Sequence, residues 1–405
     1  MKFTKLSLIA ALAVTTAMAG DAKISGDVKV FYGTTDAGNA DLFNKNGATG
    51  DASVSLDYTR SLSDMVTLNA GATYLSTLGL ENTLVSGTWA AHGGATTPQG
   101  VKDRAWIDTL NVVVKPIDKT MVVVGRQALD TPLAFTETWN VVNNTFDAAV
   151  VVDNHIENTT LVGAWVGRGN GHNGFENVSG GMSKFGALNK EQEKKLALNE
   201  GAYAVAAITK AIPNTTAQAW FYNVRNEANA FWLQGDVAAT KELSVGLQYS
   251  QISPKGVVDG ADDTKAVAGK VGYSVSGIDL AAAYSKVDDK GLVYMGNTAT
   301  GGAHNGQSKL YTEAWWNYGF VGQAGAKTAM VSAGYDLGAA NLTAQYTTVA
   351  NDINNAYEMD EVTLTATTKV GPFDTTVALI NTKSDKNEDI DGNTVQVYLT
   401  APFSL

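Results

Sequence analysis

The feature that most limits the fold of this chain is a period-two alternation of apolar and polar residues in eighteen separate stretches. In residues 66–74, every even-numbered residue is apolar and every odd-numbered one is Thr, Asn or Gly. A period of two is typical of a strand whose two faces meet different environments. We therefore expect an all-β protein with lipid on the apolar face and water on the polar face.

The stretches have about the length that a tilted strand needs to cross a bilayer. Eight tight turns alternate with nine connections that are mostly longer, and outer-membrane barrels have short periplasmic turns and long external loops. The sequence therefore predicts a transmembrane antiparallel up-and-down β-barrel of about 18 strands, with both termini on the periplasmic side. The expected strands are 23–33, 51–60, 66–77, 104–115, 120–129, 147–154, 160–168, 201–210, 216–224, 229–238, 243–252, 265–275, 278–287, 326–335, 341–349, 359–369, 373–383 and 393–403.

The N-terminus has the features of a cleavable secretory signal. A positively charged start precedes a short apolar run at residues 6–14, and Ala17 and Ala19 form a small-x-small pattern. The apolar run is far shorter than the roughly 20 residues of a spanning helix. We therefore expect residues 1–19 to be a signal peptide and residues 20–405 to form the barrel.

Composition excludes several classes of function. The formal net charge is −11, and a strongly acidic chain is a poor partner for nucleic acid, whose phosphates need Lys and Arg. The chain has no cysteine, which suits an oxidising compartment. Its four histidines lie far apart, so the sequence shows no histidine-rich metal or catalytic cluster.

Aromatic residues gather near the ends of the expected strands, where amphipathic rings suit the lipid interface. The alternative is that aromatic residues simply favour strands. We expect an aromatic girdle made of Tyr32, Tyr58, Tyr74, Trp220, Tyr222, Phe231, Trp232, Tyr249, Tyr273, Tyr284, Tyr335, Tyr346 and Tyr398.

Three short segments carry a family resemblance. Residues 125–132 read Gly-Arg-Gln-Ala-Leu-Asp-Thr-Pro, residues 143–147 read Asn-Asn-Thr-Phe-Asp, and residues 315–319 read Trp-Trp-Asn-Tyr-Gly. They resemble, in order, the end of the fifth strand, the return of the third long loop and an external-loop element of the OprD-like and major outer-membrane porins of Gram-negative bacteria. The resemblance implies an integral outer-membrane barrel of 18 strands, often trimeric, that passes small hydrophilic solutes.

The C-terminal strand adds an assembly signal. Its apolar alternation ends in Phe403 and resembles the C-terminal signal of outer-membrane proteins, although Ser404 and Leu405 follow that aromatic residue. We expect periplasmic chaperones, the barrel-insertion machinery and outer-membrane lipid as partners.

The resemblance also implies that the third loop, residues 130–146, folds inward and narrows the pore. Charges at a constriction act on a solute that bulk water does not screen. An alternative role for Arg126 is to donate hydrogen bonds to loop carbonyls. An alternative for Arg168 is a position at the membrane interface. The candidate constriction residues are the acids Asp130 and Glu137 and the bases Arg126, Arg104 and Arg168.

A cofactor is not expected, although one acidic segment has oxygen ligands at alternate positions, as calcium loops do. These residues are Asn387, Asp389 and Asp391. Position twelve of such a loop holds Tyr398 rather than Glu, and that residue belongs to a strand. We therefore expect no metal at this segment, and a bound calcium ion is the alternative.

The lead hypothesis is a passive porin for small hydrophilic solutes and ions, with a mild cation preference from the acidic loops. A substrate-specific outer-membrane channel is the first alternative. An outer-membrane enzyme would need a His-based site near the rim, for which only His92 and His304 are available, and no Gly-x-Ser-x-Gly element supports it. A secreted adhesive β-protein is the last alternative.

Overall fold

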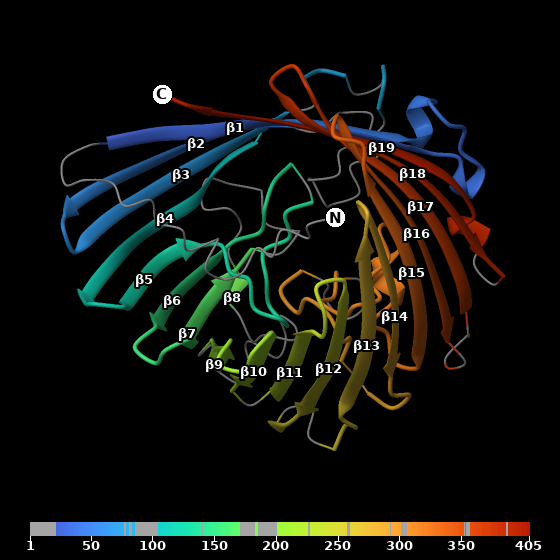
Figure 1. Cartoon of the computed structure of the whole chain (residues 1–405). Helices are drawn as coiled ribbons and strands as arrows, with labels where there is room; N and C mark the ends of the chain where they lie inside the picture. Colours follow the sequence, from blue (N-terminus) through green and yellow to red (C-terminus); the bar gives the residue numbers. More distant parts are fainter. Residues whose placement is uncertain are drawn as a thin grey trace.

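A computed structural model shows a closed antiparallel β-barrel (Figure 1). Among the described residues, eighteen strands form the wall, and a two-residue strand, β8, pairs with the end of β7 inside a connection. No helix in these parts of the chain is long and apolar enough to cross a membrane. The structure describes residues 22–76, 78–80, 83–85, 104–139, 141–170, 183–184, 201–225, 227–256, 260–291, 293–300, 306–351, 353, 357–385 and 388–405.

The strands follow one another around the ring, and β1 closes it by pairing with both β2 and β19. The predicted barrel is confirmed, and most predicted strands lie within a few residues of those observed. The predicted signal peptide, residues 1–19, lies outside the described residues. The strands are β1 (Ala22–Thr35), β2 (Ala48–Ser63), β3 (Val66–Ser76), β4 (Arg104–Ile117), β5 (Thr120–Gln127), β6 (Phe146–Asp153), β7 (Thr159–Gly169), β8 (Ser183–Lys184), β9 (Ala202–Thr209), β10 (Thr215–Val224), β11 (Ala228–Ala238), β12 (Leu243–Pro254), β13 (Thr264–Val275), β14 (Ile278–Val287), β15 (Ala326–Asp336), β16 (Ala340–Asn351), β17 (Tyr357–Val370), β18 (Phe373–Ser384) and β19 (Gly392–Ser404).

The tight turns lie at one end of the barrel and have the backbone that hairpins require. Between β13 and β14, Ser276 and Gly277 both have positive φ, at 52° and 82°. Two such residues match the right-handed twist of the flanking strands, as in a type I′ turn. These short links fix the register of neighbouring strands and leave the longer connections at the opposite end.

The two faces of the wall differ as the alternation predicts. On β2, Leu56 is 52% exposed and points outward, while Ser53, three residues away on the other face, is 2% exposed. On β12, Leu247 is 67% exposed and Gln248 beside it is 6% exposed. An apolar outer face and a polar inner face are the arrangement of a barrel that lies in lipid.

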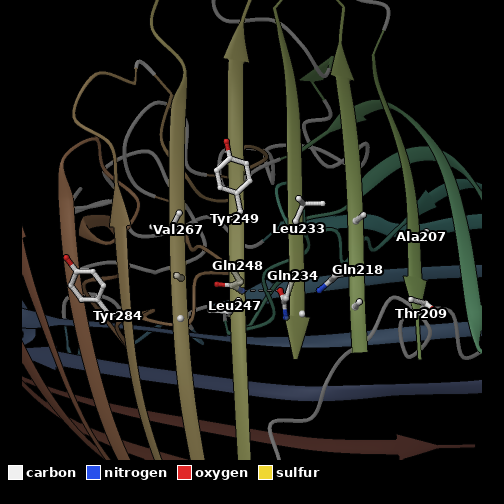
Figure 2. Close-up of a pocket in the computed structure, with 15 residues that line it drawn as sticks. Ala207, Thr209, Gln218, Leu233, Gln234, Leu247, Gln248, Tyr249, Val267 and Tyr284 are labelled. Atoms are coloured by element: carbon white, nitrogen blue, oxygen red, sulfur yellow. Dashed lines mark hydrogen bonds between the residues drawn. The ribbon is translucent and has the colours of Figure 1, made fainter. Parts of the chain in front are cut away.

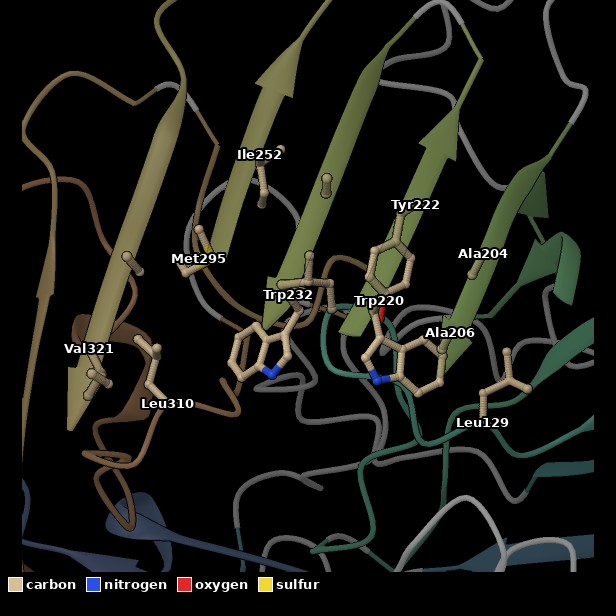
Figure 3. Packing of buried hydrophobic residues seen from close by; sticks show 14 of the residues in the cluster. Leu129, Ala204, Ala206, Trp220, Tyr222, Trp232, Ile252, Met295, Leu310 and Val321 are labelled. Carbon is tan, nitrogen blue, oxygen red and sulfur yellow. The ribbon is translucent and has the colours of Figure 1, made fainter. Parts of the chain in front are cut away.

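An apolar cluster lies inside the barrel, between the wall and the connections that enter the lumen (Figure 3). Trp220, Tyr222 and Trp232 of β10 and β11 are at most 7% exposed, so their assignment to an outer girdle was wrong. Tyr398 also lies inward, with its ring 5.0 Å from that of Phe31. The outer face does carry exposed rings at Tyr74, Phe231, Tyr249, Tyr273, Tyr284, Tyr335 and Tyr346.

Candidate pore constriction

The connection between β5 and β6, which we call the first inward loop (residues 128–145), lies within the ring of strands (Figure 1). Its entry is fixed by Gln127, whose amide donates to the carbonyls of Gly125 and Ala148, both at 3.2 Å. Gly125 has a φ of +125° and would clash with the β4 backbone if it carried a Cβ, so this position requires glycine. The strand therefore ends in a fixed direction, and the loop turns into the lumen.

Side chains of the first inward loop hold its own backbone. Asn144 accepts the backbone N–H of Glu137 at 2.7 Å and donates to the carbonyl of Phe135 at 3.0 Å. The carboxylate of Glu137 accepts the indole N–H of Trp139 at 3.0 Å. Because Glu137 is only 2% exposed, it stabilises the loop and does not face the solvent of the lumen.

The connection between β14 and β15, the second inward loop (residues 288–325), also enters the barrel (Figure 1). It leaves the wall at the end of the long connections, where we expected an external loop, but it then folds into the lumen. The buried carboxylate of Glu361 on β17 accepts the backbone N–H groups of Trp315, Trp316 and Asn317, at 2.7, 3.1 and 2.8 Å. The indole of Trp315 donates to Gln396 of β19 at 3.0 Å. Long-range contacts with the inner wall, which no local pattern shows, therefore draw this loop inward.

The two inward loops contact each other across the lumen. Asp130 forms an ion pair with Lys309, and the backbone N–H of Phe135 donates to Asn297 at 3.0 Å. The amide of Asn297 also donates to Glu137 at 3.0 Å. Because both chain segments and both charges of the pair are fixed, the loops form a single obstruction that narrows the barrel.

The second inward loop is also attached to the wall at β11 to β13. The hydroxyl of Tyr311 donates to Asp236 at 2.9 Å, and Lys270 pairs with the same carboxylate at 3.0 Å. The ammonium of Lys270 lies 4.0 Å from the centre of the Tyr311 ring, which adds a cation–π contact. This attachment holds the second inward loop against β11 to β13, so the loop narrows the lumen on that side.

A third acid of the obstruction is Glu313, whose surroundings favour the neutral carboxyl. Burial raises the pKa of the Glu313 carboxyl well above its usual value, and the carboxylates of Glu137 and Glu361 act in the same direction. Hydrogen bonds from Ser308 lower the pKa but do not offset burial.

On the opposite side, the inner wall of β1 to β4 carries carboxylates that are only partly buried. Asp57 and Asp108 flank Gly71, since a Cβ there would lie 2.5 and 2.8 Å from their Oδ1 atoms. Asp27 lies on the same inner face, 3.7 Å from the ammonium of Lys29. We call Asp27, Asp57 and Asp108 the wall acids. The sequence analysis did not select Asp57 or Asp108 as site residues.

The structure separates the predicted site residues. Asp130 and Glu137 lie together in the first inward loop. Arg126 and Arg168 instead share Asp147, at 2.9 and 2.5 Å, on the outer face, where the cross-strand partner of Arg126 is the half-exposed Leu110. A register shift between β6 and β7 puts Arg168 on the face opposite to the buried Val166. Arg126 also donates to the carbonyl of Ile107 at 2.8 Å, and Arg104 begins β4 in register with Leu75.

The calcium candidates lie at the β18–β19 connection, and the structure describes only part of it. Asp391 accepts the backbone N–H of Ser384, and Asp389 is exposed. Asn387 lies outside the described residues. Within the described part of the chain, His, Cys, Asp and Glu form no group of three or more that is suited to a metal ion.

No protein-family model matches the sequence, and no curated protein matches it either. Solved structures do match. OccK8 (OprE) of Pseudomonas aeruginosa has a TM-score of 0.73 and 16% identity, over 96% of this chain and 99% of that chain. OpdK of the same organism, solved with vanillate, has a TM-score of 0.76 and 13% identity, over 96% and 100% of the two chains. OccAB4 of Acinetobacter baumannii has a TM-score of 0.72 and 13% identity, over 96% and 99%. The likeness shows that these chains share the barrel fold.

Proposed function

We propose that this chain is an integral outer-membrane channel of the OprD-like kind, which passes a restricted class of small hydrophilic solutes. The observation that carries the proposal is the obstruction made by two inward loops, joined by the Asp130–Lys309 pair and the Asn297 contacts. A general porin needs only one narrowing loop. Two joined loops favour a selective channel over the general porin that was our first hypothesis.

The charges of the inner wall favour a cationic solute. Among the ion pairs of the described side chains, one joins a wall acid to a base, Asp27 with Lys29, whereas Asp236 and Asp130 are matched by Lys270 and Lys309. Field lines concentrate in a narrow passage with low-dielectric walls. Net negative charge along one wall therefore raises the local concentration of cations.

The solved structure of OpdK with vanillate suggests the size class of a solute, a small aromatic molecule. Vanillate is an anion, and we do not extend its charge to this chain because the wall acids would repel it. We propose an amine- or guanidinium-bearing organic cation of similar size instead.

The remaining parts of the proposal rest on the sequence. Residues 1–19 direct export, chaperones and the insertion machinery deliver the barrel to the outer membrane, and the mature chain forms a homotrimer. The proposal includes no cofactor, and a calcium ion at Asn387, Asp389 and Asp391 stays an untested alternative. The histidines that an enzyme would need, His92 and His304, lie outside the described residues, so the proposal assigns no enzymatic role.

Liposome swelling tests the proposal. Liposomes containing the folded barrel should swell faster in an organic cation such as arginine than in a neutral sugar of similar size or in vanillate. Equal swelling in all three solutes would favour a general porin. No swelling and no bilayer conductance from folded protein would reject a channel altogether.

A further inference from the structure

Aromatic side chains of the two inward loops meet inside the barrel. The ring of Trp139, from the first inward loop, lies 6.3 Å from that of Tyr318, from the second, and the two rings are tilted by 52°. Both residues are partly exposed. Because both loops lie within the ring of strands (Figure 1), we infer that the exposed parts of these side chains face water in the lumen and not lipid.

Two more aromatic residues extend this group to the wall. Trp315 of the second inward loop and Tyr398 of β19 both donate to the side-chain oxygen of Gln396, the indole N–H at 3.0 Å and the hydroxyl at 2.9 Å. Both aromatic residues are partly exposed. We call Trp139, Trp315, Tyr318 and Tyr398 the lumen aromatics.

Carboxylates lie directly behind the lumen aromatics. Glu137 accepts the indole N–H of Trp139 at 3.0 Å. Glu361 accepts the backbone N–H of Trp315 at 2.7 Å. The face of an aromatic ring attracts a cation, and a negative charge behind the ring adds to that attraction.

The hydroxyl of Tyr318 lies near several of these groups. Burial raises its pKa, and the charges of Glu137, Glu313 and Tyr398 act in the same direction. Because the interaction between charges falls off with distance, these groups lie close to Tyr318. Aromatic residues from both loops and from the wall therefore form one group, with acids behind them.

The two buried carboxylates can attract a cation but cannot bind it directly. Glu137 and Glu361 are almost fully buried, and protein N–H and O–H groups already donate to both of them. A primary ammonium would therefore lose hydrogen bonds to water at this surface without replacing them. A methylated ammonium has few such bonds to lose, and a guanidinium can stack on a ring while its N–H groups stay in water.

The inward aromatic residues of β10 and β11 do not offer such a surface. Trp220 and Trp232 are buried, and their indoles donate to Gln218 at 2.8 Å and to Gln234 at 3.2 Å. Figure 2 shows these two amides and that of Gln248 on neighbouring strands, with a hydrogen bond between Gln234 and Gln248. Because the two indole rings are hidden from water and rest on neutral amides, a solute in the lumen does not reach their faces.

We propose that the lumen aromatics bind a weakly hydrated organic cation, whose charged group is a methylated ammonium or a guanidinium. The inference rests on the proposed function, since it needs a solute that enters the lumen. It adds a chemical preference that charge alone does not give, because the field of the wall acids attracts every monovalent cation.

The strand register places this site before the wall acids on the path of a solute. Tyr398 is the cross-strand partner of Phe31 on β1, and Asp27 lies on the same face of β1, nearer the tight turns. The stretch of strand from Phe31 to Asp27 spans about 13 Å. A solute that enters from the long-connection end therefore meets the lumen aromatics first and the wall acids afterwards.

Bilayer recordings of the folded barrel test the site, with tetramethylammonium and methylammonium as the probes. In potassium chloride, added tetramethylammonium should reduce the current with an apparent Kd about tenfold lower than that of methylammonium. Both probes carry one positive charge, so the wall acids cannot account for the difference. Equal Kd values in a conducting, cation-selective barrel would overturn the site and leave the proposed function standing, whereas a folded barrel that never conducts would overturn both.

Removing the pair of rings should abolish the preference. Trp139→Leu combined with Tyr318→Leu should raise the Kd of tetramethylammonium about tenfold and leave that of methylammonium within about twofold. Trp139→Phe combined with Tyr318→Phe keeps two ring faces, so both Kd values should stay within about threefold of wild type. The matched control is Phe221→Leu with Phe231→Leu, which removes a tilted pair of rings 5.0 Å apart on the outer face and should leave both Kd values unchanged.

Each Leu change is also made alone, so that one conducting variant suffices if the pair does not fold. A Kd of tetramethylammonium that stays at the wild-type value in the Leu variants would overturn the proposal. So would an equal loss of affinity in the Phe and the Leu variants, because the ring faces would then not be what binds the cation.

Discussion

The two sides of the barrel differ in what covers the inner wall. Along β10 to β12, Trp232 and Ser250 are each 1% exposed, and Trp232 lies in one buried cluster with Met295 and Leu310 of the second inward loop. Along β1 to β4, the first inward loop covers only the external half of the inner face, where Val141 packs with Phe31 and Trp106. Nearer the tight turns, Ser55 and Asp57 are only partly buried. One side therefore supports the obstruction, and the other keeps a polar surface in contact with water. We infer that solutes follow the β1–β4 wall.

The largest loss of stability should come from detaching the second inward loop from the wall. Glu361→Ala removes the acceptor of three backbone N–H groups in the second inward loop. Because those donors are left buried and unsatisfied, we expect the free energy of unfolding to fall by about 3 kcal/mol. Denaturant unfolding of the folded barrel measures this, and protease should then cut between residues 288 and 325. The control is Glu358→Ala, an exposed position on the same strand. An intact loop in Glu361→Ala would show that other contacts hold it.

Neutralising the wall acids should change the charge selectivity of the pore without displacing the inward loops. Asp27→Asn, Asp57→Asn and Asp108→Asn combined remove the excess negative charge of the β1–β4 wall. We expect the cation-to-anion permeability ratio to fall about threefold, because the field in the passage weakens. Reversal potentials across a salt gradient measure the ratio. The outward pair Glu358→Gln and Asp360→Asn is the control, and equal effects in both variants would mean that the wall acids do not line the path.

The contact between the two loops should matter less than their attachment to the wall. A double-mutant cycle with Asp130→Asn and Lys309→Gln should give a coupling energy of about 1 kcal/mol, since both groups are partly exposed. Unfolding of the two single variants and the double variant supplies the cycle. A coupling energy near zero would remove this pair from the account of the obstruction.

The smallest expected effect is a pH dependence at the β10–β11 connection. Burial raises the pKa of Glu227 from 4.5 to about 7. Since the folded barrel favours the neutral carboxyl, the stabilisation is fully present below pH 4.5 and is lost as pH rises through about 7. The carboxyl is half exposed, so we expect a loss of less than about 1 kcal/mol. Thermal unfolding across this window should be flatter in Glu227→Gln, and an unchanged slope would assign the dependence to another group.

The strands could be predicted from the sequence because a membrane barrel repeats one local rule. Each strand alternates between lipid and the interior, so the pattern alone located the strands and the tight turns. The rule fails where both faces are apolar or aromatic. On β10, Trp220 and Phe221 lie on opposite faces, and the polar residue Gln218, which shares the face of Trp220, marks the inner side.

The site was harder to predict because it depends on contacts between distant residues. A resemblance located the first inward loop, but the second is set by Glu361, which lies 44 residues beyond Asn317 in the chain. Arg126 and Arg168 were chosen for their closeness in sequence to the first loop. A register shift after Asp147 decides which face Arg168 takes, and such an irregularity leaves little trace in composition.

The inferred solute path can be tested most directly by single cysteines, since the natural chain has none. Ser55→Cys lies on the partly exposed β2 wall, and Ser250→Cys lies on the covered wall of β12, where Ser250 is 1% exposed and pairs with Trp232. A cationic thiol-specific reagent added during bilayer recordings should reduce the conductance of Ser55→Cys and leave that of Ser250→Cys unchanged. Block of Ser250→Cys with no effect on Ser55→Cys would contradict the account.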